Sequence, residues 1–272
     1  MKQETMPENG KEKLLSLSPE GRNISLLLEY DGTNYHGWQS QAGTGQATIQ
    51  ETLERAISSL TQEQTKIYGS GRTDAGVHAL GQVANFLTKS NIPAEAWAPA
   101  LNQRLPPDIR VLASQEAAAD FHARHSAIGK IYTYRVLNRH APTSLFRNYA
   151  WHVNLPLNIR NMRKAAALLL GTHDFSAFRG AGCSAKSPVR TLNAAAIRKN
   201  GEFIELTFEA NAFLQYMVRN ITGTLVEVGL GRFEPDEIVH MLESKDRSKA
   251  GRTAPPQGLY LVRVLYDEEL RR

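Results

Sequence analysis

The chain has 272 residues, 42% of them hydrophobic and 22% charged, and its formal net charge at pH 7 is +5. This length and composition are typical of a globular protein with a hydrophobic core and one large or two medium domains, and no apolar run approaches the roughly 20 residues that cross a bilayer. The first residues, MKQETMPENGKEKLLSLSPEG, are too polar and too acidic for a signal peptide, so we expect a cytoplasmic protein with a polar tail over residues 1–21.

Strand and helix patterns alternate in the first half of the chain. Apolar residues with period two predict a half-buried strand over residues 23–30. Thr48 and Glu51 have the spacing of a capping box, and the helical repeats that follow predict a helix over residues 48–60. The same patterns predict a strand over residues 81–87, a short helix over 93–105 and a strand over 129–138.

The second half of the chain repeats this order. Helical spacing predicts helices over residues 160–171, 211–229 and 235–244, and alternation predicts strands over 201–210 and 258–267. Periodicity is lost over residues 138–151, which we interpret as a junction. We therefore predict an α+β protein of two similar subdomains, an N-terminal α+β catalytic half over residues 22–140 and a C-terminal α+β half over 141–272.

Positive charge is concentrated in one part of the chain. Residues 121–201 contain thirteen lysines and arginines and one acid, Asp174, so this stretch carries a net charge of +12 and leaves −7 for the remainder. Folding does not require such a block, and a partner rich in phosphate is the usual reason to keep like charges together. The alternative is a solvated surface neutralised by acids from elsewhere in the chain. We favour a nucleic acid partner.

A glycine-rich stretch, YGSGRTDAGVHALGQVANF, surrounds a single acid, Asp74. Glycines 69, 71 and 76 permit left-handed or crowded backbone, so Asp74 can lie on a sharp loop that faces a ligand. Arg72 either holds an acid ionised or reaches a phosphate. The alternative is a plain turn in which Asp74 caps its own backbone, and the residues alone leave both open.

Two further elements carry side chains that suit such a site. Tyr132 and Tyr134 share one face of the predicted strand 129–138, where each ring either belongs to the core or contacts a base. Arg219 lies beside the apolar stripe of the predicted helix 211–229, and a guanidinium at the edge of the core requires a buried carboxylate as partner. The alternative is an arginine whose charged end reaches solvent.

No motif indicates a metal ion or a nucleotide cofactor, and we expect neither. His122 and His125 are three residues apart and His78 follows Asp74 by four, but neither an HExxH pattern nor a second cysteine accompanies them. P-loop and GxGxxG motifs are absent from the sequence. The single Cys183 excludes an internal disulfide framework and fits a reducing compartment, and its neighbours offer no base that would activate it as a nucleophile.

Five stretches carry a family resemblance: EYDGTNYHGWQ, GSGRTDAGVHALGQVANF, FHARHSA, KIYTYRV and ANAFLQYMVRNITGTLVEVG. Together they resemble the tRNA pseudouridine synthase A family, over a region from about Asn23 to Asp267. The resemblance implies an isomerase without metal or other cofactor that converts uridine to pseudouridine at positions 38, 39 and 40 in the anticodon stem-loop of tRNA. It also implies a homodimer of RRM-like (ferredoxin-like) halves, with antiparallel sheets joined across a central basic cleft.

The resemblance also implies roles for four residues. The catalytic nucleophile falls on Asp74, and the arginine paired with it falls on Arg219, where it would lower the pKa of Asp74. The tyrosine that lies over the target uracil, suggested as the base at its C5 atom, falls on Tyr132. Arg72 corresponds to the loop arginine thought to help displace the target base, which makes it a substrate-binding residue.

Two loops have compositions that suit an RNA partner. In YDGTNYHGWQSQ, Tyr35 and Trp38 either line a cleft or belong to the core beneath a loop. Residues 178–190, FRGAGCSAKSPVR, resemble a mobile basic loop that contacts the RNA stem.

Two other functions compete with the isomerase. A noncatalytic RNA-binding protein with the same fold would not need Asp74, because a carboxylate repels phosphate. A metal-assisted phosphoesterase would need a second carboxylate or a histidine pair near Asp74, and the sequence offers only His78. The set of Asp74, Tyr132 and Arg219 therefore favours the isomerase.

Overall fold

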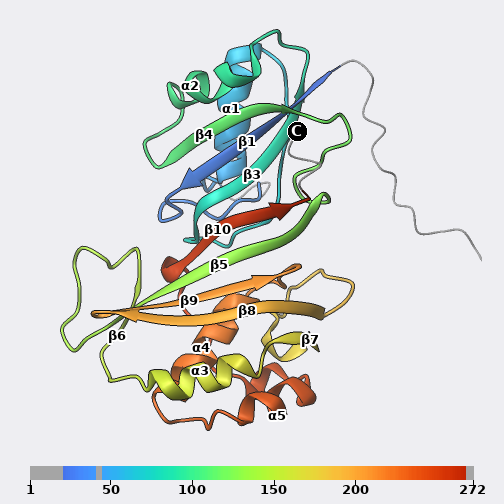
Figure 1. The fold of residues 1–272 in the computed structure, drawn as a ribbon. Coiled ribbons are helices and arrows are strands. Elements are labelled where there is room, and N and C mark those ends of the chain that lie inside the picture. The colour runs from blue at the N-terminus through green and yellow to red at the C-terminus, as the bar shows by residue number, and fades with distance from the viewer. Residues whose placement is uncertain (1–20, 41–44, 268–272) are drawn as a thin grey trace, which may run out of the picture.

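The computed structural model describes residues 21–40 and 45–267, which form ten strands and five α-helices (Figure 1). Apart from Gly21, the predicted tail over residues 1–21 lies outside the described residues. The strands are β1 (Arg22–Tyr30), β2 (Ile67–Gly69), β3 (His78–Thr88), β4 (Ile109–Ala117), β5 (Ala127–Asn138), β6 (Trp151–Val153), β7 (Gly171–Asp174), β8 (Val189–Asn200), β9 (Phe203–Ala210) and β10 (Leu259–Tyr266). The helices are α1 (Ile49–Thr61), α2 (Trp97–Asn102), α3 (Ile159–Ala167), α4 (Met217–Gly229) and α5 (Glu237–Ser244).

All ten strands belong to one mixed sheet, in the order β4-β1-β3-β10-β5-β9-β8-β7, with β2 paired to β3 and β6 paired to β5. The last strand of the chain, β10, lies in the middle, parallel to β3 and antiparallel to β5. The predicted α+β class is confirmed, but the sheet is continuous and not purely antiparallel. Because β10 joins the N-terminal strands to β5, the halves over residues 22–140 and 141–272 share this sheet, and the domain boundary stays a prediction.

Helices cover the sheet at its two ends. α1 lies behind β1, β3 and β4, and α3, α4 and α5 gather at the other end beside β8 and β9 (Figure 1). The predicted inward residues of the first strand, Ile24, Leu26 and Leu28, are fully buried. The Thr48 side chain accepts a hydrogen bond from the Glu51 backbone at 3.3 Å, which caps α1 as predicted.

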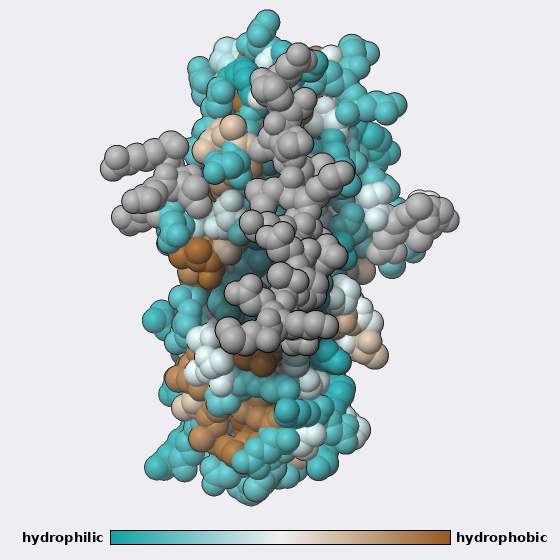
Figure 2. Space-filling model, turned by 90° about the vertical axis from the view of Figure 1, so that its right-hand side faces the viewer, coloured by the Kyte–Doolittle hydropathy of each residue, from teal (hydrophilic) through white to brown (hydrophobic). Residues whose placement is uncertain are grey.

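The surface differs between the two ends. In Figure 2 the visible residues at the upper end are mostly hydrophilic, whereas hydrophobic residues gather near the lower end, where α3, α4 and α5 lie. Within the described part of the chain, no helix has both the length and the apolar character needed to cross a membrane.

Several predicted helices have different bounds in the structure, and the helix predicted over residues 93–105 is only α2, Trp97–Asn102. The helix predicted over residues 211–229 begins only at Met217, because Tyr216 has a left-handed backbone with φ of 62° that the helix cannot continue through. The helix predicted over 160–171 ends at Ala167, and Gly171, with φ of 100°, begins strand β7 instead. Strands β4 and β8 were not predicted, because their outward positions are polar and their alternation is weak.

Gly223 allows α4 to pack against a segment that leads into β10. A Cβ atom at this position would overlap the carbonyl oxygen of Arg252, and a Cβ at Gly251 would lie 2.7 Å from the Cα of Thr224. The two backbones therefore touch, and the contact fixes the segment over residues 250–255 against the helix. This segment carries Ala254, whose carbonyl group holds the side chain of Arg219.

We expect Gly223→Ala to destabilise the protein, since the added methyl group forces α4 and residues 250–255 apart. Overpacking of this kind costs about 1–3 kcal/mol, and the better helix propensity of alanine offsets at most about 1 kcal/mol. Urea unfolding measures the change. Gly182→Ala is the control, because a methyl group there meets only the Gln215 side-chain oxygen at 3.7 Å. Equal stability of the two variants would contradict this packing.

Candidate active site

Asp74 lies on the loop between β2 and β3 and is largely withdrawn from solvent, with a side chain 24% exposed. The backbone of this loop is held on both sides of the acid. The Thr73 carbonyl accepts a hydrogen bond from the Trp38 backbone at 3.0 Å, and the Val77 backbone donates to the Asp74 carbonyl at 3.1 Å. Asp74 is thus fixed by a second loop, residues 31–38, and it does not cap its own turn.

Glycines make this close approach of the two loops possible. A Cβ atom at Gly37 would overlap the Thr73 carbonyl oxygen, and a Cβ at Gly32 would overlap that of Val77. Of the three glycines noted around Asp74, only Gly76 has a left-handed backbone, with φ of 75°. Gly69 instead lies under the Trp38 ring, where a side chain would overlap it. The glycines therefore serve mainly to let chains touch.

Arg219, in the first turn of α4, supplies the cation for this acid. Its Nη1 donates to Asp74 Oδ2 at 3.0 Å, its Nε donates to the Ala254 carbonyl at 2.8 Å, and its side chain is 13% exposed. The guanidinium also lies 4.9 Å from the centre of the Tyr216 ring, a cation–π contact. The prediction of a carboxylate partner for Arg219 is confirmed, and the alternative of a solvated arginine is wrong.

Tyr216 supports Arg219 at the cost of backbone strain. A left-handed backbone at a residue other than glycine costs about 1–3 kcal/mol and persists where the surroundings enforce it. The Tyr216 ring packs on Gly180, where a side chain would lie 2.5 Å from Cδ2, and the Gly180 backbone donates to the Gln215 carbonyl at 2.8 Å. Residues 178–190 thereby help to hold the start of α4.

The pKa of Asp74 reflects two opposed effects. Burial raises the pKa of the carboxyl group, and the hydrogen bond and charge of Arg219 lower it, with a net rise above the ordinary value. The predicted lowering by Arg219 is confirmed, but desolvation outweighs it and the net shift is upward. Without Arg219, the carboxylate form would be less favourable still.

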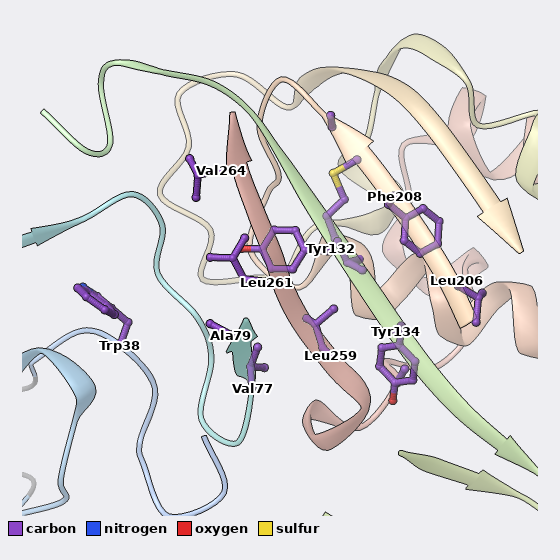
Figure 3. Packing of buried hydrophobic residues seen from close by; sticks show 14 of the residues in the cluster. Trp38, Val77, Ala79, Tyr132, Tyr134, Leu206, Phe208, Leu259, Leu261 and Val264 are labelled. Atoms are coloured by element: carbon purple, nitrogen blue, oxygen red, sulfur yellow. The ribbon is translucent and has the colours of Figure 1, made fainter. Parts of the chain in front are cut away.

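The two tyrosines of β5 share a face but differ in their hydroxyl groups. Figure 3 shows both rings on β5, with Leu259 and Leu261 of β10 close by. Tyr134 is fully buried and donates to the Pro255 carbonyl at 2.7 Å. Tyr132 is also buried, packs edge-on against Phe213, and its hydroxyl makes no hydrogen bond with other described residues. Burial, together with Tyr30 and Asp74, raises the pKa of the Tyr132 hydroxyl.

Comparison with known proteins identifies this arrangement. A family model described as tRNA pseudouridine synthase matches residues 27–126 and 165–267. This chain belongs to the tRNA pseudouridine synthase family. Pseudouridine synthases are isomerases, so the family assigns the class of enzyme, and the resemblance carried by the motifs is confirmed.

Curated relatives cover nearly the whole chain. The tRNA pseudouridine synthase A of Thermoanaerobacter sp. (strain X514) is 53% identical over 245 residues, which are 90% of this chain and 100% of that protein. The protein of the same name from Acetivibrio thermocellus is 50% identical over 245 residues, with the same coverage. The tRNA pseudouridine synthase A 2 of Clostridium tetani is 48% identical over 246 residues, 90% of this chain and 99% of that protein.

Arg72 is the fourth predicted site residue. It takes no part in the ion pair between Asp74 and Arg219. Its side chain is exposed and makes no ion pair or hydrogen bond with another described residue. It stands two residues before Asp74 on the same loop, so it is free to meet a ligand that enters beside the acid. Its role in displacing a base stays a prediction.

Part of the basic block is neutralised by acids beyond it. Arg135 pairs with Glu205 at 3.1 Å and Arg139 with Glu202 at 3.0 Å, both on or next to β9. For these residues the solvated-surface alternative is correct. The arginines and lysines nearer the start of β5 have no such partners among the described residues and remain available for an anionic ligand.

Other candidate residues have structural surroundings. Tyr35 and Trp38 are buried, at 8% and 2% exposed, so they belong to the core beneath the loop. His78 is buried and accepts a hydrogen bond from the Gly32 backbone at 3.0 Å. Among residues 21–40 and 45–267, no group of three or more histidine, cysteine, aspartate or glutamate side chains is placed to hold a metal ion.

Several supporting residues escaped the sequence patterns. The Ala254 carbonyl group accepts a hydrogen bond from Arg219, and the Tyr216 ring packs against its guanidinium. Gly223 lets the segment that carries Ala254 lie against α4. No local signal marks a backbone carbonyl as an orienting group. Lys130 was not singled out either, although a signal was present: alternation in the motif KIYTYRV places it on the same face as Tyr132.

We expect the Asp74 carboxyl group to titrate above the ordinary aspartate value of about 3.9, and higher still in Arg219→Gln, which removes the guanidinium that lowers its pKa. NMR titration of 13C-labelled aspartate measures both. Asp174 is the internal reference: burial raises its pKa, but hydrogen bonds from Ser176 and Lys245 bring it below the ordinary value. A midpoint for Asp74 below that of Asp174 would contradict the balance described above.

Proposed function

We propose that this member of the tRNA pseudouridine synthase family isomerises uridine to pseudouridine at positions 38, 39 and 40 in the anticodon stem-loop of tRNA, with Asp74 as the catalytic carboxylate. The observation that carries the proposal is the ion pair between Asp74 and Arg219, whose side chains come from positions 145 residues apart. A half-buried carboxylate with one cationic partner and one open oxygen is suited to react with a sugar carbon.

The reaction itself fits a site made only of side chains. The N1–C1′ bond of uridine breaks, the uracil turns, and a C5–C1′ bond forms, while C5 loses a proton and N1 gains one. No atom is added or removed. Asp74 either attacks C1′ or takes a proton from C2′, and both routes need the ionised carboxylate. Arg219 supports that form by lowering the pKa that burial raises.

Tyr132 is the residue proposed to lie over the uracil and to act at C5. Its hydroxyl has no partner among the described residues, and Asp74 is close enough to influence its pKa. Because that pKa is raised, the hydroxyl is protonated before the reaction. A neutral hydroxyl can accept the C5 proton only as it loses its own, and N1 of the uracil is the atom that gains a proton in the reaction, so the transfer from C5 through the hydroxyl to N1 leaves the tyrosine unchanged.

The target uridine must leave its stack to reach Asp74. Extrusion of a base costs a few kcal/mol, which contacts of the flipped nucleotide with the enzyme offset. Stacking on an aromatic side chain contributes about 1–3 kcal/mol per base, and Tyr132 is the ring proposed for this contact. Arg72, exposed on the Asp74 loop, is proposed to help displace the base.

The wider setting follows from the family. The relatives are named for action on tRNA, and the motif resemblance supports the anticodon stem-loop as the region modified, a homodimer as the active form and the cytoplasm as the compartment. The resemblance also supports a reaction without cofactor. The alternative of a noncatalytic RNA-binding protein is not favoured, because binding alone gives no reason to bury a carboxylate beside a ligand that carries negative charge.

We expect Asp74→Asn to abolish the isomerisation while RNA binding survives, because the variant keeps the shape of the side chain but loses its charge. The assay uses unmodified tRNA with tritium at uracil C5, which is released when the C5–C1′ bond forms. Asp120→Asn is the matched control, since Asp120 is exposed. Tritium release by Asp74→Asn at the wild-type rate would remove Asp74 from the mechanism, and a requirement for added metal would favour a different reaction.

We expect Tyr132→Phe to lose activity but not stability, and Tyr134→Phe to lose stability but not activity. Tyr132→Phe removes a hydroxyl that has no partner within residues 21–40 and 45–267, so stability stays unchanged while the rate falls about 10²–10⁴-fold, the usual contribution of a positioned acid or base. Tyr134→Phe breaks the bond to the Pro255 carbonyl, which costs about 0.5–1.5 kcal/mol of stability, with little effect on rate. Single-turnover kinetics and urea unfolding separate the two. A Tyr132→Phe rate within twofold of wild type would leave this ring only a stacking role.

A further inference from the structure

Lys130 occupies an unusual position beside the Asp74 loop. It stands near the start of β5, two residues before Tyr132, and regular pairing of β5 with β9 places both side chains on the same face. A Cβ atom built on Gly71 would lie 3.2 Å from Cε and 3.7 Å from Nζ of Lys130. The lysine therefore lies directly against the loop, one residue from Arg72 and three from Asp74.

Within the described part of the chain, the ammonium group of Lys130 has no counter-charge. Lys130 is half-buried, and Nζ makes no hydrogen bond or ion pair with any other described residue. The neighbouring charges that act on it, Arg124 and Arg190, are both positive, and together with burial they lower its pKa to about 8. Burial is the larger cause. A partly desolvated cation among cations is unfavourable for folding, and because none of the described residues offers it a partner, it is suited to bind an anionic ligand.

Arg190 also has a polar group without a partner among the described residues. It lies on β8 and donates from Nη1 to the carbonyl groups of Ser187 and Val189, at 2.9 and 2.6 Å. Its Nε is buried and has no acceptor among the described residues. β8 pairs with β9 and β9 with β5, so Leu192, two residues from Arg190, lies in the same row as Ala210 and Lys130. The side chains of Arg190 on β8 and Lys130 on β5 therefore lie close enough for the Arg190 charge to lower the pKa of Lys130.

We propose that Lys130, with Arg124 and Arg190, binds a backbone phosphate of the RNA next to the extruded uridine. Two residues along a strand span about 7 Å, so a group bound at Lys130 lies one short step from the ring of Tyr132. This spacing suits a phosphate and a base that belong to one nucleotide or to two adjacent nucleotides. The proposal rests on the function proposed above and assigns Lys130 a positioning role, since it does not meet the reacting atoms.

A phosphate satisfies the three groups better than a carboxylate from a protein would. It carries several acceptor oxygens, which match the ammonium of Lys130, the unpaired Nε of Arg190 and the fork of Arg124. A Cβ atom at position 71 would lie 3.2 Å from Lys130 Cε, so the lysine stem packs closely on the backbone of Gly71. Lys130 would thereby couple backbone binding to the loop that carries Asp74.

The test measures how the affinity for an unmodified tRNA transcript depends on salt, in the wild type, Lys130→Gln and Lys130→Arg. We expect Lys130→Gln to raise Kd about ten- to a hundredfold and to reduce the slope of log Kd against log salt by about 1. Lys130→Arg keeps the charge and restores most of the slope. At saturating tRNA, kcat of Lys130→Gln stays within about threefold of wild type, because the contact acts on binding.

Lys199→Gln is the matched control, because it removes the same charge from the exposed far end of β8. Lys199 is seven residues beyond Leu192 on that strand, or about 23 Å from the row that contains Lys130. An equal loss of slope in Lys199→Gln and Lys130→Gln would overturn the proposal, since it would show a general effect of charge. Arg190→Gln gives a second reading if Lys130→Gln folds poorly, and an unchanged slope in Arg190→Gln would also overturn it.

Repeating the salt series in the Asp74→Asn background separates this proposal from the proposed function. Binding needs no turnover, so the loss of slope in Lys130→Gln should be the same in both backgrounds. If the wild type releases no tritium but the slope still changes, the isomerase function fails and the phosphate site stands. If tritium release is normal and the slope does not change, the phosphate site fails alone.

Discussion

The ion pair between Asp74 and Arg219 is the contact on which the rest of the site depends. The acid comes from a loop in the first half of the chain and the arginine from the first turn of α4, at a separation of 145 residues. Their meeting requires β10 to lie between β3 and β5, and it requires residues 250–255 to touch α4 at Gly223. The continuous sheet thus brings together the two parts of the chain that form the ion pair.

Burial sets the chemical character of this centre. Desolvation disfavours the ionised acid and raises the pKa of Asp74, while Arg219 opposes that effect. The result is a partly desolvated carboxyl group beside a fixed cation, the combination that the proposed reaction with a sugar carbon would use. Fixed partners surround it: the Ala254 carbonyl orients Arg219, and the backbones of Trp38 and Val77 orient the loop.

Much of this arrangement could be predicted from local patterns, and the failures have physical causes. Period-two alternation predicted β1, and the capping residue Thr48 predicted the start of α1, because both signals are local. The start of α4 was missed, because the left-handed Tyr216 is imposed by packing on Gly180 and not by its own sequence. The ion pair and the lowering effect of Arg219 on the Asp74 pKa were predicted, but the net rise was not, since the depth of burial follows from tertiary structure. The place of β10 in the sheet has no local signal at all.

The central claim is that the Asp74 carboxylate, held by Arg219, faces the sugar of an extruded uridine. A crystal structure of Asp74→Asn with a bound anticodon stem-loop RNA tests it most directly. The account predicts a uridine out of its stack, with Tyr132 against its base and with C1′ or the C2′ hydrogen about 3–3.5 Å from the residue at position 74, the separation of reacting atoms in a near-attack geometry. A uridine that stays stacked in the stem-loop, or a sugar that approaches the protein away from position 74, would contradict it.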